Sequence, residues 1–240
     1  MKRIGIVAHS AEGAALCFLA ACHEGERRLG AHFHPDIVLD IEAMGASMAD
    51  WESHTLAPIA RRFAHAAQRL QAAGADFFVC PDNTAHMAFE AMAPLLPIPG
   101  LHIAEIVAEE AVRRGFCKIG ITGTLWTMEG PVYPAAFGRR ALAFTSPPRG
   151  ERELVQQIIF DELVRGTILD ASRRRFADVV AGLKEQGCDA VVLGCTELPL
   201  LLDDTTSPLP VLDSTRLLAR AAVDVALGDR PMPEWRGGPL

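Results

Sequence analysis

The sequence predicts an α/β protein made of two pseudo-symmetric lobes, each a mostly parallel sheet flanked by helices. Strand-length apolar runs alternate with helix-length amphipathic runs, which is typical of parallel sheets. The chain also repeats itself, because Arg61-Arg62-Phe63-Ala64 recurs as Arg174-Arg175-Phe176-Ala177. The match continues without a gap to Gly74 and Gly187, at a constant offset of 113 residues. A repeat of this length indicates two related structural units.

The first half of the chain is expected to hold three strands and three helices. Gly30 and Gly74 each follow an amphipathic run and can end a helix. Pro94, Pro97 and Pro99, followed by Gly100, then break the chain. The expected strands are residues 2–8, 36–41 and 75–80, and the expected helices are residues 12–29, residues 56–73 and a short one from Thr84.

The second half repeats this scheme. Residues 118–122 match residues 3–7, and the strand at 189–193 follows the second copy of the repeat. Ser214 is placed to cap the last helix. The expected strands are residues 118–122, 141–144, 189–193 and 209–212, and the expected helices begin near Trp126 or span residues 151–165, 171–186 and 215–227.

These elements set the expected domain boundaries. We assign residues 1–98 together with 209–230 to the first lobe, and residues 99–208 to the second. Residues 231–240 are rich in proline and glycine, and we expect them to form a loose tail.

Composition excludes several classes of function. The formal net charge of −7 argues against nucleic-acid binding, which needs a basic face. No apolar run approaches the ~20 residues of a membrane helix, and the strand at the N-terminus is too short for a signal peptide. The six cysteines form no Cys-x-x-Cys pair, which indicates reduced thiols in a cytoplasmic protein.

The sequence also predicts that no cofactor or metal is bound. It has no dinucleotide-binding glycine fingerprint and no phosphate loop ending in Lys-Ser or Lys-Thr. His32, His34 and Asp36 are the kind of residues that bind metals, but no second cluster accompanies them, and a surface position fits them better.

Polar side chains follow four of the expected strands. They are His9-Ser10, Asp82-Asn83-Thr84, Thr122-Gly123-Thr124 and Cys195-Thr196-Glu197. Taken singly, each of these is most simply a helix cap. Together they favour a small-anion pocket, because helix N-termini offer free N–H groups at the carboxyl ends of parallel strands.

Asp82 and Cys195 occupy equivalent places in the two halves, at the repeat's offset of 113 residues. A thiol near a helix N-terminus is a usable base, and Cys80 is only a reserve candidate for this role. An ordinary Asp, with a pKa near ~3.9, is a weak base and holds no proton at neutral pH. Burial or a nearby thiolate would raise that pKa; the alternative is that Asp82 only caps a turn or helix.

The two motifs Asp82-Asn83-Thr84-Ala85-His86 and Gly194-Cys195-Thr196-Glu197 resemble those of the aspartate/glutamate/hydantoin racemase superfamily, in particular its aspartate racemase-like branch. The resemblance spans nearly the whole chain and includes Ser10, residues 123–128 and residues 158–163. It implies two α/β lobes with an active site in the cleft between them, no pyridoxal phosphate or metal, and often a homodimer.

In this family two cysteines face opposite sides of the substrate α-carbon, one removing the proton and the other delivering a new one. Cys195 matches the second cysteine, while Asp82 stands in place of the first. Family members often carry an arginine for the distal carboxylate of aspartate in the stretch that matches residues 39–47, and no basic residue lies there in this chain. The substrate-binding residues carried over from the motifs are Asn83, Thr84, Thr196 and Glu197, with Ser10, Thr124 and Thr127 as further pocket positions.

Three functions follow from this comparison. The first is an isomerase, a cofactor-independent racemase or epimerase of a small carboxylate-bearing substrate such as aspartate or glutamate, with Cys195 and Asp82 as its acid–base pair. The second is a single-cysteine decarboxylase or cis–trans isomerase of a dicarboxylate. The third is a binding protein that kept the pocket and lost catalysis.

Overall fold

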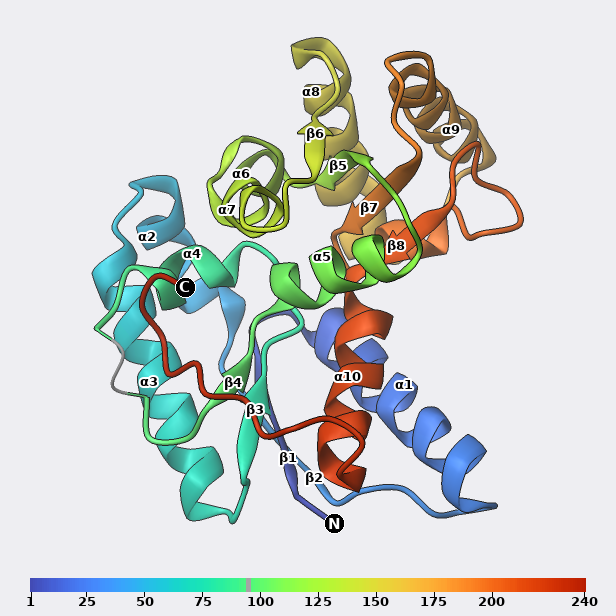
Figure 1. Ribbon diagram of the computed structural model, residues 1–240. Helices are drawn as coiled ribbons and strands as arrows, with labels where there is room; N and C mark the ends of the chain where they lie inside the picture. The colour runs from blue at the N-terminus through green and yellow to red at the C-terminus, as the bar shows by residue number, and fades with distance from the viewer. Residues whose placement is uncertain (94–95) are drawn as a thin grey trace. The chain divides into compact units, whose positions relative to one another are not determined.

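The computed structural model describes residues 1–93 and 96–240, which form two compact units (Figure 1). One unit consists of Met1–Ile103 and Thr215–Leu240, and the other of Ala104–Ser214. Within the described residues each unit contains a four-stranded parallel sheet, with strand order β2-β1-β3-β4 in the first and β6-β5-β7-β8 in the second. The two orders are equivalent, so the predicted α/β fold with two related halves is confirmed.

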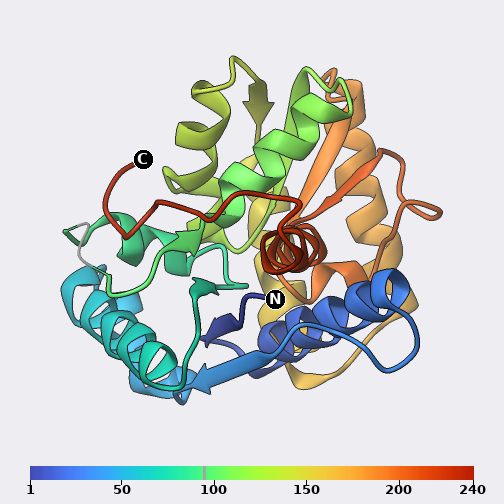
Figure 2. The ribbon, with the colours of Figure 1, turned by 60° about the horizontal axis from the view of Figure 1, so that its bottom comes forward.

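In the first unit the sheet is covered by helices on both faces. Helices α1 and α10 lie side by side on one face, where Arg28 pairs with Asp224 at 2.5 Å (Figures 1 and 2). Helix α3 covers the other face with the apolar side chains of its helical repeat. The strands are β1 (Ile4–Ala8), β2 (Ile37–Ile41), β3 (Phe77–Val79) and β4 (Gly100–Leu101), and the helices are α1 (Ala11–Leu29), α2 (Met48–Glu52), α3 (Leu56–Ala72), α4 (Ala85–Glu90) and α10 (Ser214–Leu227).

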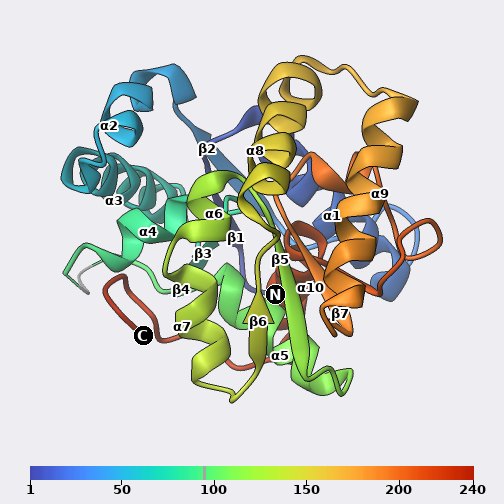
Figure 3. The ribbon, with the colours of Figure 1, turned by 90° about the horizontal axis from the view of Figure 1, so that it is seen from above.

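The second unit is built in the same way. Helix α9 runs alongside β7 and packs against β5 and β7 (Figure 3). The expected helix at 151–165 is divided into α8, a π-helical turn at Ile158–Glu162 and a 3₁₀ turn at Leu163–Arg165. The strands are β5 (Lys118–Gly123), β6 (Ala143–Thr145), β7 (Ala190–Gly194) and β8 (Val211–Asp213), and the helices are α5 (Ile103–Arg113), α6 (Leu125–Glu129), α7 (Val132–Gly138), α8 (Arg149–Gln157) and α9 (Asp170–Glu185).

The internal repeat is visible at the level of single hydrogen bonds. Gly74 and Gly187 each follow a helix with φ values of +86° and +87°, which glycine adopts without strain. Two residues later, the Asp76 carboxylate accepts the Arg3 N–H at 2.7 Å, and the Asp189 carboxylate accepts the Lys118 N–H at 3.1 Å. Each aspartate therefore fixes the start of the neighbouring strand in its own sheet.

Two of the expected boundaries between the lobes were wrong. Residues 209–214 were assigned to the first lobe, but β8 pairs with β7 in the second sheet. Residues 99–103 were assigned to the second lobe, but β4 pairs with β3 in the first sheet. Strand β4 has only two residues and α5 was missed, since its residues follow the expected chain break directly. Of the residues in that break, Pro94 lies outside the described part of the chain.

The expected loose tail is also a correction, because residues 231–240 are held by the first unit. The Gly100 N–H donates to the Trp235 carbonyl at 2.8 Å, and the Gly238 N–H donates to the Phe89 carbonyl at 2.9 Å. The Trp235 ring stacks on His86, with a centroid distance of 5.9 Å (tail in dark red, Figure 1). Contacts with the buried His86 ring and with backbone groups of the first unit therefore hold this segment in place, although its composition predicts a loose tail.

The helices and the cysteines bear on where the chain could reside. Within residues 1–93 and 96–240, the helices all fall short of the length and apolarity that crossing a membrane requires. The six cysteines all lie in these ranges, and none of them forms a disulfide.

Candidate active site

The loop after β3 places the Asp82 carboxylate against the loop after β1. Because β1 and β3 are parallel neighbours, the residues that follow them emerge at the same edge of the sheet. One carboxylate oxygen of Asp82, Oδ2, lies 2.6 Å from His9 Nδ1. The other, Oδ1, accepts the Ala85 N–H at 3.0 Å and so caps α4. Asp82 therefore fills the capping role and at the same time pairs with a histidine.

The pairing decides the charge on Asp82. Burial raises the pKa of this carboxyl group, but the charge and hydrogen bond of His9 and the Ala85 N–H outweigh burial, so the pKa is lowered. Burial and a nearby thiolate, the two influences that the sequence suggests, would each raise this pKa, and the contact with His9 reverses the direction. Burial lowers the pKa of His9, but Asp82 outweighs this, and the pKa of His9 is raised.

The second ring nitrogen of His9 faces two polar side chains of the segment between β2 and α3. His9 Nε2 lies 3.1 Å from Ser47 Oγ and 3.2 Å from Trp51 Nε1. The Phe63 ring packs edge-on against the imidazole at a centroid distance of 5.6 Å. His9 is thus held in place by hydrogen bonds at both ring nitrogens and by aromatic packing.

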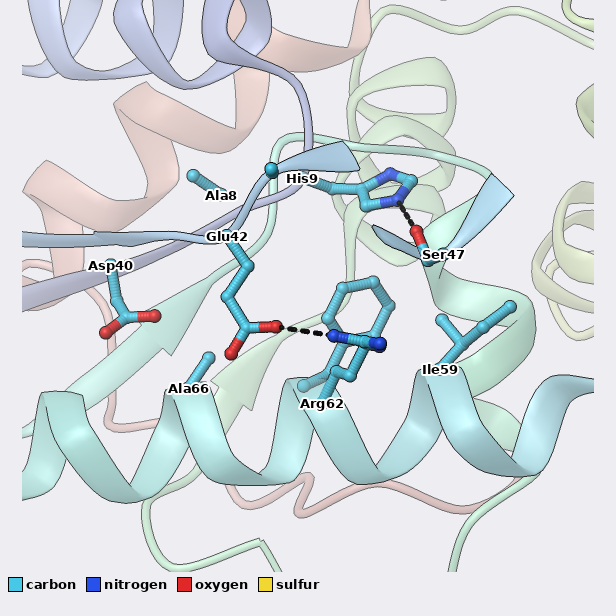
Figure 4. Close-up of a pocket in the computed structure, with 10 residues that line it drawn as sticks. Ala8, His9, Asp40, Glu42, Ser47, Ile59, Arg62 and Ala66 are labelled. Atoms are coloured by element: carbon cyan, nitrogen blue, oxygen red, sulfur yellow. Dashed lines mark hydrogen bonds and ion pairs between the residues drawn. The ribbon is translucent and has the colours of Figure 1, made fainter. Parts of the chain in front are cut away.

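His9 lines a recess of the first unit whose other walls come from β2 and α3 (Figure 4). Arg62 points into this recess and pairs with Glu42 at 3.4 Å. Arg69, about two turns further along the same face of α3, binds Asp40 and Glu42 at 2.6 and 2.8 Å. The basic residues beside the 39–47 stretch therefore come from α3, which the sequence alone did not indicate.

His86 has a structural role. Its Nδ1–H donates to the Asp82 carbonyl at 2.8 Å, and its Nε2 accepts the Ile103 N–H at 3.2 Å. Burial, with the neighbouring His102, lowers the pKa of His86 to about 3. The neutral ring therefore braces the Asp82 backbone.

In the second unit, the loop after β7 holds a thiol and a carboxylate together. Cys195 Sγ donates to Glu197 Oε2 at 2.8 Å, and the Glu197 side chain is buried. Cys195 itself is half-buried, whereas Cys80 in the first unit is fully buried, and burial raises the pKa of the Cys80 thiol. The reserve candidate Cys80 is therefore the less reactive of the two thiols.

The remaining candidate residues fall into one set per unit. Ser10 Oγ accepts the Gly13 N–H at 3.2 Å and caps α1, and Thr124 Oγ1 accepts the Thr127 N–H at 3.3 Å and caps α6. In the first unit Ser10 caps α1, while Asp82, Asn83 and Thr84 directly precede α4, and the second unit carries Thr124, Thr127, Cys195, Thr196 and Glu197.

The model of the Asp/Glu/hydantoin racemase family matches residues 14–222. The chain belongs to this family. Its relatives include the broad-specificity amino-acid racemase RacX of Bacillus subtilis, 26% identical over 164 residues, which are 67% of this chain and 69% of that protein. A glutamate racemase of Pseudomonas entomophila is 30% identical over 185 residues, which are 72% of this chain and 66% of that protein.

Solved structures of the family share the fold. A proposed Asp/Glu racemase from Yersinia pestis superposes with a TM-score of 0.87 at 30% identity, covering 95% of this chain and 100% of that one. An aspartate racemase homologue from Pyrococcus horikoshii superposes with a TM-score of 0.81 at 25% identity, with the same two coverages. Relatives in both comparisons are named racemases, which are isomerases of amino acids.

Proposed function

We propose that this protein is a cofactor-independent racemase or epimerase of a small carboxylate-bearing substrate, an amino acid such as aspartate or glutamate. Membership of the racemase family supports the reaction type. The observation that carries the proposal is that each unit presents an acid–base pair after an equivalent strand: Asp82 with His9 after β3 and β1, and Cys195 with Glu197 after β7.

Racemisation requires proton removal on one face of the α-carbon and proton delivery on the other. Cys195 supplies a thiol whose hydrogen is directed at Glu197, so a proton is held at this position. Asp82 and His9 supply a carboxylate and an imidazole that share a proton. In the proposed reaction each pair serves one face, and the carbanion between the two steps is stabilised by donors to its carboxylate.

Short polar side chains beside the two pairs are the proposed substrate contacts. Asn83, Thr84, Thr196 and Glu197 directly follow the proposed acid–base residues in sequence. Ser10, Thr124 and Thr127 stand at helix starts, where backbone N–H groups favour an anion. The Ser10 oxygen accepts a backbone N–H and keeps its own hydrogen to donate to a substrate carboxylate.

Proton NMR in D₂O tests this function with purified protein and separate D- and L-enantiomers of aspartate and glutamate. The proposal predicts loss of the α-proton signal, and Cys195→Ala should abolish this loss for one of the two enantiomers. Cys117→Ala, which removes an exposed thiol, is the matched control and should leave exchange intact. Undiminished exchange in Cys195→Ala would contradict the assignment of the thiol.

A second candidate function rests on the residue at position 82. Because the equivalent of Cys195 is a carboxylate held in an ion pair, Cys195 is the one thiol at the two repeat-related positions. A single thiol suits a decarboxylase that protonates one face of an enolate, or an isomerase that attacks an alkene. A chiral product of one hand from a prochiral malonate would favour this candidate, and tight binding without any exchange would favour a binding protein.

The proposal includes a homodimer in the cytoplasm. Six cysteines without a disulfide among them are consistent with a reducing compartment. Light scattering coupled to size-exclusion chromatography would measure the mass of the particle, for which twice 25.9 kDa is expected.

A further inference from the structure

Asp82 alone is poorly suited to its place in the reaction, because a carboxylate holds no proton to deliver at neutral pH. The structure gives it an imidazole partner at 2.6 Å. We propose, building on the racemase function above, that His9 is the group that gains and loses the proton in the first unit. Asp82 is then the positioning residue that holds the imidazole.

The hydrogen bonds of Asp82 fix the orientation of His9. Asp82 Oδ1 is tied to the Ala85 N–H at 3.0 Å, and its backbone carbonyl is tied to His86 at 2.8 Å. Oδ2 is left to accept the Nδ1–H of His9. A histidine whose Nδ1–H is held by a carboxylate offers its Nε2 for proton transfer.

The surroundings of His9 Nε2 satisfy both protonation states. Trp51 Nε1 is a donor only, so at 3.2 Å it serves the lone pair of the neutral ring. Ser47 Oγ donates its own hydrogen to the Met44 carbonyl at 3.0 Å, so its oxygen can accept an N–H. At 3.1 Å it serves the Nε2–H of the charged ring. One nitrogen with a donor and an acceptor beside it can change its protonation state without leaving a buried polar group unsatisfied.

His86 provides an internal contrast. Its two ring nitrogens are both bound to backbone groups, one to a carbonyl and one to an N–H. That arrangement fits only the neutral ring, and burial lowers the pKa of His86 to about 3. His9 and His86 lie on either side of Asp82, and only the surroundings of His9 accommodate both states.

The charged groups around His9 also favour a titrating imidazole. The Asp82 carboxylate is in direct contact, and it outweighs burial to raise the pKa of His9. The other charges that line the same recess come from β2, the residue after it, and α3, and they are paired with one another: Asp40 and Glu42 with Arg69, and Glu42 with Arg62. The neighbours on α2 and the apolar wall, Trp51, Ile59 and Phe63, carry no charge.

In the proposed reaction two bonds to hydrogen break and two form. The α C–H bond breaks, its proton passes to His9 Nε2, and the electron pair stays on the substrate and is delocalised into its carboxylate. The S–H bond of Cys195 then breaks, the proton forms the new C–H bond, and the thiolate remains. In the reverse direction the Cys195 thiolate takes the proton and the imidazolium of His9 delivers one.

Ser47, His9 and Asp82 also lie in the order of a nucleophilic serine, a base and its orienting carboxylate. The Ser47 hydrogen, however, is directed to Met44, and the side chain is buried. Ser47 is therefore an acceptor for His9 here. Acetylation of Ser47 by p-nitrophenyl acetate, lost in Ser47→Ala, would overturn this interpretation and with it the proposed role of His9.

The test uses the 240-residue protein labelled with ¹⁵N and follows the imidazole nitrogens by NMR between pH 5 and pH 9, with His9→Gln to assign the signals. The inference predicts an Nδ1–H tautomer for neutral His9 and reversible protonation at Nε2. Asp82→Asn and Ser47→Ala should each shift this titration to lower pH. A His9 ring that stays in one protonation state over this range would overturn the inference.

A second readout separates this role from a structural one. With any enantiomer that the wild type exchanges in D₂O, His9→Gln should slow exchange on one face at least ~100-fold, the usual scale of general acid–base catalysis. The pH profile of that exchange should follow the His9 titration, and Ser47→Ala should shift both together. Undiminished exchange of both enantiomers in His9→Gln would overturn the inference alone, whereas no exchange by the wild type would overturn the proposed function as well.

Discussion

Replacing Asp82 with asparagine tests the His9–Asp82 pair as a contact whose contribution to stability depends on pH. The carboxylate offers one oxygen to His9 at 2.6 Å and the other to the Ala85 N–H at 3.0 Å. Asparagine has a single acceptor oxygen and no charge, so it can satisfy only one of the two. The two side chains are only 10% and 17% exposed, and solvent therefore replaces the lost contact poorly.

The directions of the two pKa shifts set the pH range. The pKa of Asp82 is lowered, so its contribution is present above its unfolded value of ~3.9 and is lost as the pH falls through the folded value. The pKa of His9 is raised, so its contribution is full below its unfolded value of ~6.5 and is lost as the pH rises through the folded value. The charged pair therefore stabilises the protein fully between about pH 4 and pH 6.5.

Urea unfolding at pH 5.5 and pH 9 measures the effect. At pH 5.5 the substitution removes a charged hydrogen bond and should lower the free energy of unfolding by about 1.5–3 kcal/mol. At pH 9 the same contact is closer to a neutral one, and the loss should fall to about 0.5–1.5 kcal/mol. A loss that is equal at the two pH values, or larger at pH 9, would refute this reasoning.

Asp203→Asn is the matched control. Asp203 accepts hydrogen bonds from Thr205 and Thr206 in an exposed loop, and these bonds lower its pKa to about 2. Its carboxylate is therefore charged at both pH values. The effect of this substitution on stability should not change between pH 5.5 and pH 9.

Three further substitutions test other contacts. Gly100→Ala would place a methyl group 2.4 Å from the Phe78 ring, and this overpacking should cost about 1–3 kcal/mol in urea unfolding; unchanged stability would contradict the close approach. Trp235→Ala should destabilise the first unit by about 3 kcal/mol in the same assay, because the ring packs against His86 and Phe89. An unchanged free energy of unfolding would instead support the expectation that the tail is loose. Glu197→Gln removes the carboxylate that accepts the Cys195 hydrogen and disfavours a thiolate, so iodoacetamide should alkylate Cys195 several-fold faster at pH 8, and a slower reaction would contradict this.

The internal repeat made most of the fold predictable from the sequence. Gly74 and Gly187 end helices at equivalent places, and Asp76 and Asp189 fix equivalent strands, so local signals and global topology agree. The failures lie where tertiary contacts override composition. The tail was expected to be loose, yet Trp235 finds a partner in His86, more than 140 residues away along the chain.

The candidate site was predicted only in part, and for a related reason. Asp82 and Cys195 were selected by their positions after equivalent strands, which is information in the sequence. The partnership of Asp82 with His9 spans 73 residues and depends on β1 and β3 being neighbours in the sheet. A signal for it was present, because polar residues directly after adjacent parallel strands meet at one edge. The contributions of Ser47 and Trp51 had no such signal, since they come from a segment with short, irregular helices.

The most direct test of the account compares α-proton exchange from the separate D- and L-enantiomers in His9→Gln and in Cys195→Ala. Two groups that serve opposite faces of one carbon predict complementary losses: each variant should abolish exchange from one enantiomer and spare the initial exchange from the other. Loss of the same enantiomer's exchange in both variants, or no loss in either, would contradict the account.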